Sequence, residues 1–163
     1  MTKGWAAFCW SVVAALSMVV TPALAQRKPP YWASVAAQAN EARMRTGPGK
    51  QFPTSWIFQR PRLPLRVIGV YREWRKVEDP GKTQGWILSR LLSPQRTGLI
   101  INGIAAMHAS PDANAKIVFR AAPGVVGKLS ECARGWCLFD VNGQMGYVET
   151  SSIWGVDVEE TRR

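Results

Sequence analysis

Residues 41–49 read EARMRTGPG, and residues 104–112 read IAAMHASPD. Met44 and Pro48 of the first stretch therefore correspond to Met107 and Pro111 of the second. Further landmarks recur in the same order at nearly the same spacing: a tryptophan, a glycine-aromatic-aliphatic triplet, and a serine with an apolar pair. They are Trp74, residues 85–87 and residues 89–92 in the first copy, and Trp136, residues 146–148 and residues 152–154 in the second. The repeat predicts two copies of one small fold.

Each copy contains short apolar runs broken by Gly, Pro and Asn, which is typical of strands rather than helices. The expected strands are LPLRVIGVY (63–71), WRKVE (74–78) and QGWIL (84–88), matched by VVGKLSEC (125–132), WCLFDV (136–141) and QMGYVE (144–149). Asn142-Gly143 is the dipeptide most favoured in two-residue hairpin turns. The predicted class is all-β, with two tandem small barrels.

The order M-R-T-G-P-G, E-W-R-K-V, Q-G-W-I and S-R-L-L over residues 40–93 resembles the bacterial Src-homology-3-like (SH3-like) domain. The second copy departs from that pattern: residues 108–112 replace R-T-G-P-G, and Tyr147 replaces Trp86. We therefore expect a degenerate second domain. The resemblance implies a module that binds cell-wall material or other envelope components.

The N-terminus has the layout of a secretory signal peptide, with a lysine near its start, an apolar stretch over residues 6–20 and small residues before Ala25. We expect cleavage between Ala25 and Gln26. The apolar stretch is shorter than a membrane-spanning helix, so the mature protein should lack an integral membrane span. The predicted location is periplasmic or secreted.

The remaining chain divides into a linker (26–39), a first domain (40–96), a second domain (97–156) and a tail (157–163). The first domain holds 12 Lys and Arg against 4 Asp and Glu, a net charge of +8, whereas the second domain is neutral. This asymmetry predicts that the two domains present different surfaces. The stretches Pro29-Pro30-Tyr31-Trp32 and Pro61-Arg62-Leu63-Pro64 are expected to be a linker and a loop, although either could be an internal ligand for an aromatic groove.

The stretch Arg45-Thr46-Gly47-Pro48-Gly49-Lys50 is similar to part of a phosphate-binding loop, but it lacks the first glycine and the hydroxyl residue of that motif. Pro48-Gly49 instead favours a turn. The only histidine, His108, is expected to be an ordinary surface strand residue rather than a general base. No pair of carboxylates indicates glycoside hydrolysis. These patterns predict no enzyme activity, no cofactor and no metal.

Cys132 and Cys137 bracket the expected turn between two strands of the second domain, at positions that can face each other across an antiparallel pair. An exported protein meets an oxidising environment. We therefore predict a Cys132–Cys137 disulfide. A zinc site completed by His108 would lack a fourth ligand, and a redox pair would need C-x-x-C spacing.

Because no catalytic residues are expected, the protein is predicted to act by binding a partner. The first domain offers a candidate surface, since its sequence interleaves cationic residues with aromatic residues. Trp86 and Trp56 are expected to be core residues, whereas Trp74 is expected to be exposed. The candidate binding residues are Tyr71, Arg72, Trp74, Arg75, Arg45 and Arg90.

The expected partner is anionic and lies outside the cytoplasm, which excludes nucleic acid. The leading hypothesis is a non-catalytic module that docks on peptidoglycan or another anionic envelope component. An adaptor that binds an extended segment of an envelope protein is the alternative. A cell-wall hydrolase is a minor alternative, since two copies, a linker and a tail account for the whole mature chain.

Overall fold

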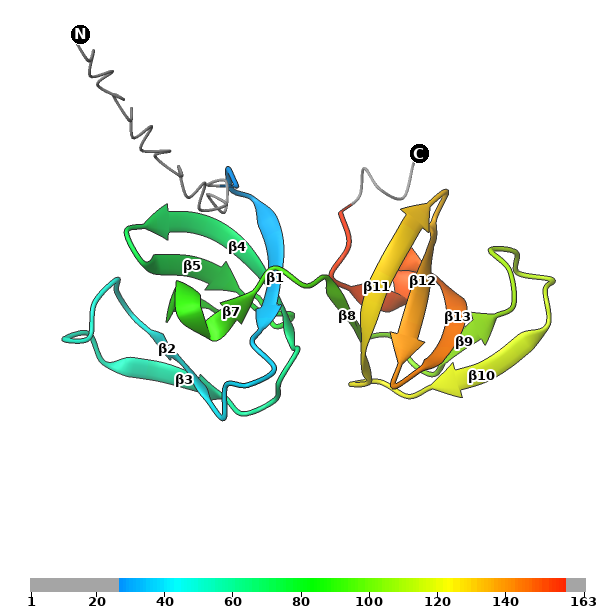
Figure 1. The fold of residues 1–163 in the computed structure, drawn as a ribbon, viewed down its shortest axis with the longest axis horizontal. Helices are drawn as coiled ribbons and strands as arrows, with labels where there is room; N and C mark the ends of the chain where they lie inside the picture. Colours follow the sequence, from blue (N-terminus) through cyan, green and yellow to red (C-terminus); the bar gives the residue numbers. More distant parts are fainter. Residues whose placement is uncertain (1–26, 158–163) are drawn as a thin grey trace, which may run out of the picture.

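The computed structural model describes residues 27–157 and shows two β-barrels that lie side by side (Figure 1). This part of the chain contains strands and two short 3-10 helices, and no helix in it is long and apolar enough to cross a bilayer. The all-β class and the two tandem units predicted from the repeat are confirmed. The signal peptide, its cleavage between Ala25 and Gln26, and residues 158–163 of the tail lie outside the described residues.

The first barrel (residues 31–93) and the second barrel (residues 97–154) have the same strand order. The elements of the first are β1 (Tyr31–Val35), β2 (Ala42–Arg45), β3 (Thr54–Phe58), β4 (Pro64–Tyr71), β5 (Trp74–Glu78), β6 (Gln84–Leu88), η1 (Ser89–Leu91) and β7 (Leu92–Ser93). Those of the second are β8 (Thr97–Ile100), β9 (Ala105–His108), β10 (Ile117–Ala121), β11 (Val126–Ala133), β12 (Trp136–Val141), β13 (Gln144–Glu149), η2 (Thr150–Ser152) and β14 (Ile153–Trp154). The sheet orders are β3-β2-β6-β5-β4-β1-β7 and β10-β9-β13-β12-β11-β8-β14.

The predicted boundaries of the linker need correction. Residues 31–35, which we placed in the linker, form β1 and pair with both β4 and β7. Pro64 likewise begins β4 rather than continuing a loop. The strand was missed because YWASV is short and nearly all buried, so it lacks the alternation that marks a strand with one face in water.

The turns follow their sequences closely. Asn142 and Gly143 have φ angles of 53° and 92°, as a two-residue hairpin of this twist requires, and the Gly143 N–H donates to Asp140 Oδ1 at 2.7 Å. The loop over residues 46–53 is a turn, as predicted, closed by a hydrogen bond from Thr46 N to Pro53 O. The absence of the phosphate-loop motif therefore rests on the sequence, and the structure shows that this segment forms a turn.

Each barrel has its own hydrophobic core, and the repeated methionines lie at corresponding places in them. Met44 and Met107 are fully buried. A Cβ on Gly85 would overlap the Met44 side chain, and a Cβ on Gly146 would lie 2.7 Å from Met107 Cβ. The repeated glycines are thus required because each methionine packs directly on the glycine backbone.

The predicted disulfide is present. Cys132 and Cys137 face each other across β11 and β12 and are joined by an S–S bond of 2.01 Å. The bond takes the place that the Val70 and Arg75 pair occupies in the first barrel. It therefore joins the β11–β12 hairpin covalently, whereas the β4–β5 hairpin has no covalent link at the corresponding place.

Replacing both cysteines by alanine is expected to lower the free energy of unfolding of the second barrel by about 2 kcal/mol, because the bond closes only a short loop. Urea denaturation of the wild type and the double variant measures this difference. Two free thiols in the unreduced, exported protein would contradict the prediction.

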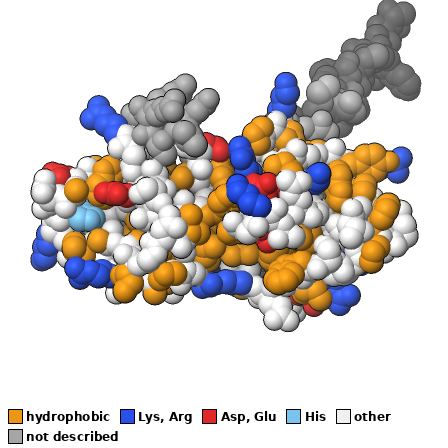
Figure 2. Space-filling model, turned by 180° about the vertical axis from the view of Figure 1, so that it is seen from behind, with side chains coloured by type: hydrophobic (Ala, Val, Ile, Leu, Met, Phe, Trp, Pro, Cys, Tyr) orange, Lys and Arg blue, Asp and Glu red, His pale blue; other side chains and the backbone are white. Residues whose placement is uncertain are grey.

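The two barrels pack on each other through a pair of tryptophans. Trp32 of β1 is 6% exposed and meets Trp154 of β14 edge to face, with ring centroids 5.1 Å apart. The indole N–H of Trp32 donates to Asp157 Oδ1 at 2.9 Å, and Thr97 Oγ1 donates to the Arg62 carbonyl at 2.8 Å. Figure 2 shows hydrophobic side chains gathered in the middle of one face, where the barrels meet.

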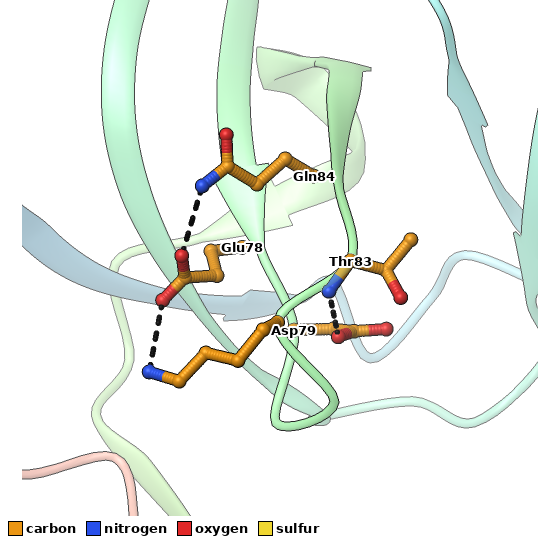
Figure 3. A network of polar contacts seen from close by, with 5 residues as sticks. Glu78, Asp79, Thr83 and Gln84 are labelled. Atoms are coloured by element: carbon orange, nitrogen blue, oxygen red, sulfur yellow. Dashed lines mark hydrogen bonds and ion pairs between the residues drawn. The ribbon is translucent and has the colours of Figure 1, made fainter.

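Lys82, in the loop between β5 and β6, extends to Trp154 of the tryptophan pair. Its Nζ lies 4.8 Å from the Trp154 ring centroid and 3.3 Å from Glu78 Oε1. Gln84 donates to the other oxygen of Glu78 at 2.9 Å, while Asp79 accepts from the Thr83 N–H (Figure 3). The hydrogen bond from Gln84, followed by the bond and charge of Lys82, lowers the pKa of the Glu78 carboxyl in spite of its partial burial.

This lowered pKa predicts a pH dependence of stability. A carboxyl whose pKa is lower in the folded state stabilises the fold at neutral pH. That contribution is lost as the pH falls below the ordinary pKa of the carboxyl and toward its pKa in the folded state. Between pH 6 and pH 3 the urea midpoint of the wild type should therefore fall further than that of Glu78→Gln. Equal falls in the two proteins would show that Glu78 contributes nothing.

Candidate functional site

The first barrel carries a shallow hollow of about 260 Å³, here called the basic hollow. It lies between β2, the loop that follows β2, the start of β5 and the η1 segment. Its lining residues are Glu41, Arg43, Arg45, Lys50, Trp74, Leu88, Arg90 and Leu91.

The alternation of β2 aims its arginines at the hollow. Ala42 and Met44 are fully buried in the core, so Arg43 and Arg45 extend from the opposite face of the strand. Arg45 also donates to the Phe52 carbonyl at 2.6 Å and thereby holds the loop that carries Lys50. One strand and its loop thus supply three of the four cations.

The floor and the far wall come from β5, β6 and η1. Trp74 is 4% exposed and pairs with Leu88 across β5 and β6. A hydrogen bond from Ser89 N to Glu73 O at 2.8 Å fixes the start of η1, which places Arg90 at the rim. The hollow therefore has an apolar base and a cationic edge.

Four cations and one carboxylate line the hollow, which leaves a formal charge of +3. Glu41 accepts a hydrogen bond from Arg43 Nε at 2.7 Å, but both side chains are about half exposed. Such a pair is weak in water and can exchange for a ligand carboxylate. The arrangement suits binding of carboxylate or phosphate groups by charge-assisted hydrogen bonds.

The same residues do not suggest catalysis. The only carboxylate in the lining is paired with an arginine, whereas acid and base chemistry needs a group placed to move a proton. Across residues 27–157, no three His, Cys, Asp or Glu side chains gather closely enough to hold a metal ion.

Three of the six predicted binding residues meet in the basic hollow, namely Arg45, Trp74 and Arg90. The other three are not among its lining residues. Tyr71 and Arg72 form the tip of the β4–β5 hairpin, with the Arg72 guanidinium 5.5 Å from the Tyr71 ring centroid. Arg75 donates to the Tyr31 hydroxyl at 3.1 Å and to two backbone carbonyls, so it supports the hairpin.

The predicted exposure is wrong for Trp74 and Trp56 and only partly right for Trp86. Trp74, expected to be exposed, is buried at the hollow that the β2 arginines and η1 line with it. Trp56, expected in the core, is 56% exposed because β3 is the edge strand of its sheet. Trp86 is half-buried, since its neighbours Gly85 and Ile87 face the core instead.

Sequence reasoning left out Glu41, Lys50, Leu88 and Leu91, and it gave Arg43 no place among the binding residues. A signal for Arg43 was present, because it lies two residues from Arg45 and so shares its face of β2. Nothing local could reveal Leu88 and Leu91, whose position depends on how η1 folds over Trp74.

The corresponding region of the second barrel has lost the cations. Strand pairing places Ala106 where the first barrel has Arg43, and His108 where it has Arg45. In the same way, Glu149 corresponds to Leu88 and Ser151 to Arg90. The positive charge of the basic hollow is therefore a property of the first barrel.

His108 is buried rather than a surface residue, which corrects the sequence-based expectation. Its ring is 8% exposed, packs edge to face on Trp136 at 5.3 Å, and has Nδ1 2.9 Å from the Ala115 carbonyl. Arg45 makes the corresponding bond to the loop of the first barrel. In both barrels a side chain at this position therefore donates to the loop, a guanidinium in the first and an imidazole in the second.

Comparison with known protein families gives one match in each copy of the internal repeat. The family model of the bacterial SH3 domain matches residues 38–94 and again residues 102–155. No curated protein matches the chain.

Two solved structures from Trichomonas vaginalis are similar over most of the chain. NlpC1 is 13% identical, with 78% of this chain and 46% of that chain covered and a TM-score of 0.36. NlpC2 is 14% identical, with 79% of this chain and 51% of that chain covered and a TM-score of 0.36. This chain spans about half the length of each.

Both family matches coincide with a barrel, and together they cover more than half of the 163 residues. The chain therefore belongs to the bacterial SH3 domain family, of which it carries two tandem copies.

Proposed function

We propose that this protein is a non-catalytic binding module of the cell envelope whose basic hollow docks on peptidoglycan or on another anionic envelope polymer. The observation that carries the proposal is that the arginines are present at only one of the two repeated sites. Arg43, Arg45 and Arg90 surround the hollow of the first barrel, and uncharged side chains or a histidine replace them in the second.

The chemistry of the hollow supports a polymer with carboxylates. Guanidinium groups pair with carboxylates through two parallel hydrogen bonds, and the stem peptides of peptidoglycan carry free carboxylates. Leu88 and Leu91 are only partly buried and offer apolar contact beside the cations. A ligand that combines acidic groups with a sugar or alkyl surface fits this lining.

Family membership and the predicted export agree with this partner. Bacterial SH3 domains are typically associated with the cell wall or the extracellular space. A periplasmic or secreted location would bring the basic hollow into contact with wall polymers and keep it from nucleic acid.

Co-sedimentation of the mature protein with purified peptidoglycan sacculi tests the proposal. The experiment is run at low salt and at about half-molar salt, where the Debye length falls to roughly 4 Å. We expect strong binding at low salt that is reduced but retained at high salt, because the apolar floor also contributes. Binding abolished by salt would indicate general adhesion of a basic protein, and no binding in either buffer would contradict the proposal.

One observation favours the adaptor as a second candidate. Strand β3 lies at the edge of its sheet, carries no charge, and exposes Trp56 and Ile57. An extended peptide could pair with such an edge through backbone hydrogen bonds. A protein partner bound in this way would be retained in high salt and lost on Trp56→Ala, whereas binding of sacculi would not depend on Trp56.

A further inference from the structure

A second hollow lies where the two barrels meet. It has a volume of about 280 Å³ and is called here the junction hollow. The turn Arg60-Pro61-Arg62 and Ala37 line it from the first barrel, and Val126 of β11 lines it from the second. Its charged side chains are two arginines, neither of which belongs to the basic hollow.

The internal repeat shows what this turn needs for folding alone. The Arg62 N–H donates to the Val35 carbonyl at 2.9 Å, and the Gly124 N–H donates to the Ile100 carbonyl at 2.8 Å. Since β1 and β8 correspond, Arg60-Pro61-Arg62 corresponds to Ala122-Pro123-Gly124. The second barrel thus makes the same turn with alanine and glycine.

The backbone of this turn favours glycine, yet the first barrel has an arginine there. The φ angle is 63° at Arg62 and 85° at Gly124, both in the left-handed region that side chains disfavour. Unfavourable backbone conformations of this kind are concentrated at binding and catalytic sites. Since the second barrel makes the same turn with glycine, the turn itself does not require the Arg62 side chain.

Both guanidinium groups are available for a ligand. Arg60 and Arg62 are exposed, and neither side chain is bonded to another residue in the range 27–157. Arg60 reaches toward the second barrel, with Nη1 3.7 Å from the place that a Cβ on Gly124 would occupy. The buried bond from Thr97 Oγ1 to the Arg62 carbonyl holds the turn in place from the other side.

We propose that the junction hollow is a second anion site, in which Arg60 and Arg62 bind one carboxylate or phosphate group of a polymer. The site exists only while the barrels are packed together, because Val126 closes it from the second barrel. It goes beyond the function proposed above, since neither arginine lines the basic hollow and the junction can bind an anion whether or not the basic hollow is occupied.

Titration of the isotopically labelled protein with hexaglutamate and, separately, with tripolyphosphate tests the site, using backbone amide resonances. We expect the amides of Thr97, Gly124 and Val126 to shift with at least one probe, and the stronger probe identifies carboxylate or phosphate as the preferred group. The amides of Lys50 and Arg90 report on the basic hollow in the same experiment, so binding at each hollow is detected independently of binding at the other.

The decisive variant is Arg60→Ala with Arg62→Gly, which gives the turn the sequence Ala-Pro-Gly that already folds in the second barrel. Loss of two charged contacts should weaken binding at the junction about tenfold. Lys116→Ala with Arg120→Ala removes the same charge from exposed positions of the second barrel and should have little effect. Equal affinities in the two variants, or no junction shifts with either probe, would overturn the proposal.

Discussion

Arg43→Ala combined with Arg90→Ser is expected to weaken binding to peptidoglycan sacculi by about tenfold or more, since two charge-assisted contacts are lost. The two substitutions give the basic hollow the residues that the second barrel has at these positions, Ala106 and Ser151. Both arginines are exposed, so the variant should keep its stability. Co-sedimentation over a range of sacculus concentrations measures the change in affinity.

The second barrel provides the matched control. Ala106→Glu with Ser151→Glu lowers the net charge by the same two units at the corresponding site, and it should leave binding nearly unchanged. If both double variants lost affinity equally, binding would depend on net charge alone. That result would contradict the role of the basic hollow.

Trp32→Ala is expected to release the two barrels from each other and to lower the free energy of unfolding by about 3 kcal/mol, the range found for large core aromatics. The substitution removes the edge-to-face contact with Trp154 and the hydrogen bond to Asp157. Urea denaturation measures the stability. Small-angle scattering should show a larger radius of gyration, because the contacts that remain, the Thr97–Arg62 hydrogen bond and the Lys82–Trp154 contact, are expected to be too weak to hold the barrels together.

Trp56→Ala is the control for loss of a tryptophan. Trp56 is 56% exposed on an edge strand, so its removal should cost less than about 0.5 kcal/mol and leave the radius of gyration unchanged. An unchanged radius in Trp32→Ala would mean that other contacts, such as the Thr97 bond to Arg62, hold the junction without the tryptophan pair.

Features with a local cause could be predicted from the sequence. Asn142-Gly143 specifies its hairpin through backbone preference, and Cys132 and Cys137 face each other because the strands around their turn fix the register. The repeat predicted two barrels because the landmark methionines and glycines have the same packing role in both copies, with Met44 on Gly85 and Met107 on Gly146.

Features that depend on distant contacts were missed or mistaken. Trp74 was expected to be exposed and Trp56 to be buried, and the structure shows the reverse. Trp74 lies in the hollow beside η1, and Trp56 lies on an edge strand. The alternation of side chains within a single strand predicts neither of these positions. Arg45 and Arg90, 45 positions apart in the chain, meet in one hollow only after the sheet closes. Trp32 was placed in a linker because the partner that buries it, Trp154, lies at the far end of the chain.

The burial of Trp74 also changes how the binding site should be tested. Its substitution by alanine would remove the floor of the hollow and much local packing, so a loss of binding could not be separated from a loss of structure. The exposed arginines at the rim are the better probes.

The central claim is that the basic hollow of the first barrel holds an anionic wall polymer, and a titration with soluble peptidoglycan fragments tests it most directly. Backbone amide resonances of the labelled protein would be followed at moderate salt. Of the two repeated sites, the account predicts shifts only in the first, at residues 41–50, Trp74 and residues 88–91, with the corresponding residues 104–113, Trp136 and 149–152 unchanged. Shifts spread evenly over both barrels, or centred on the second, would contradict it.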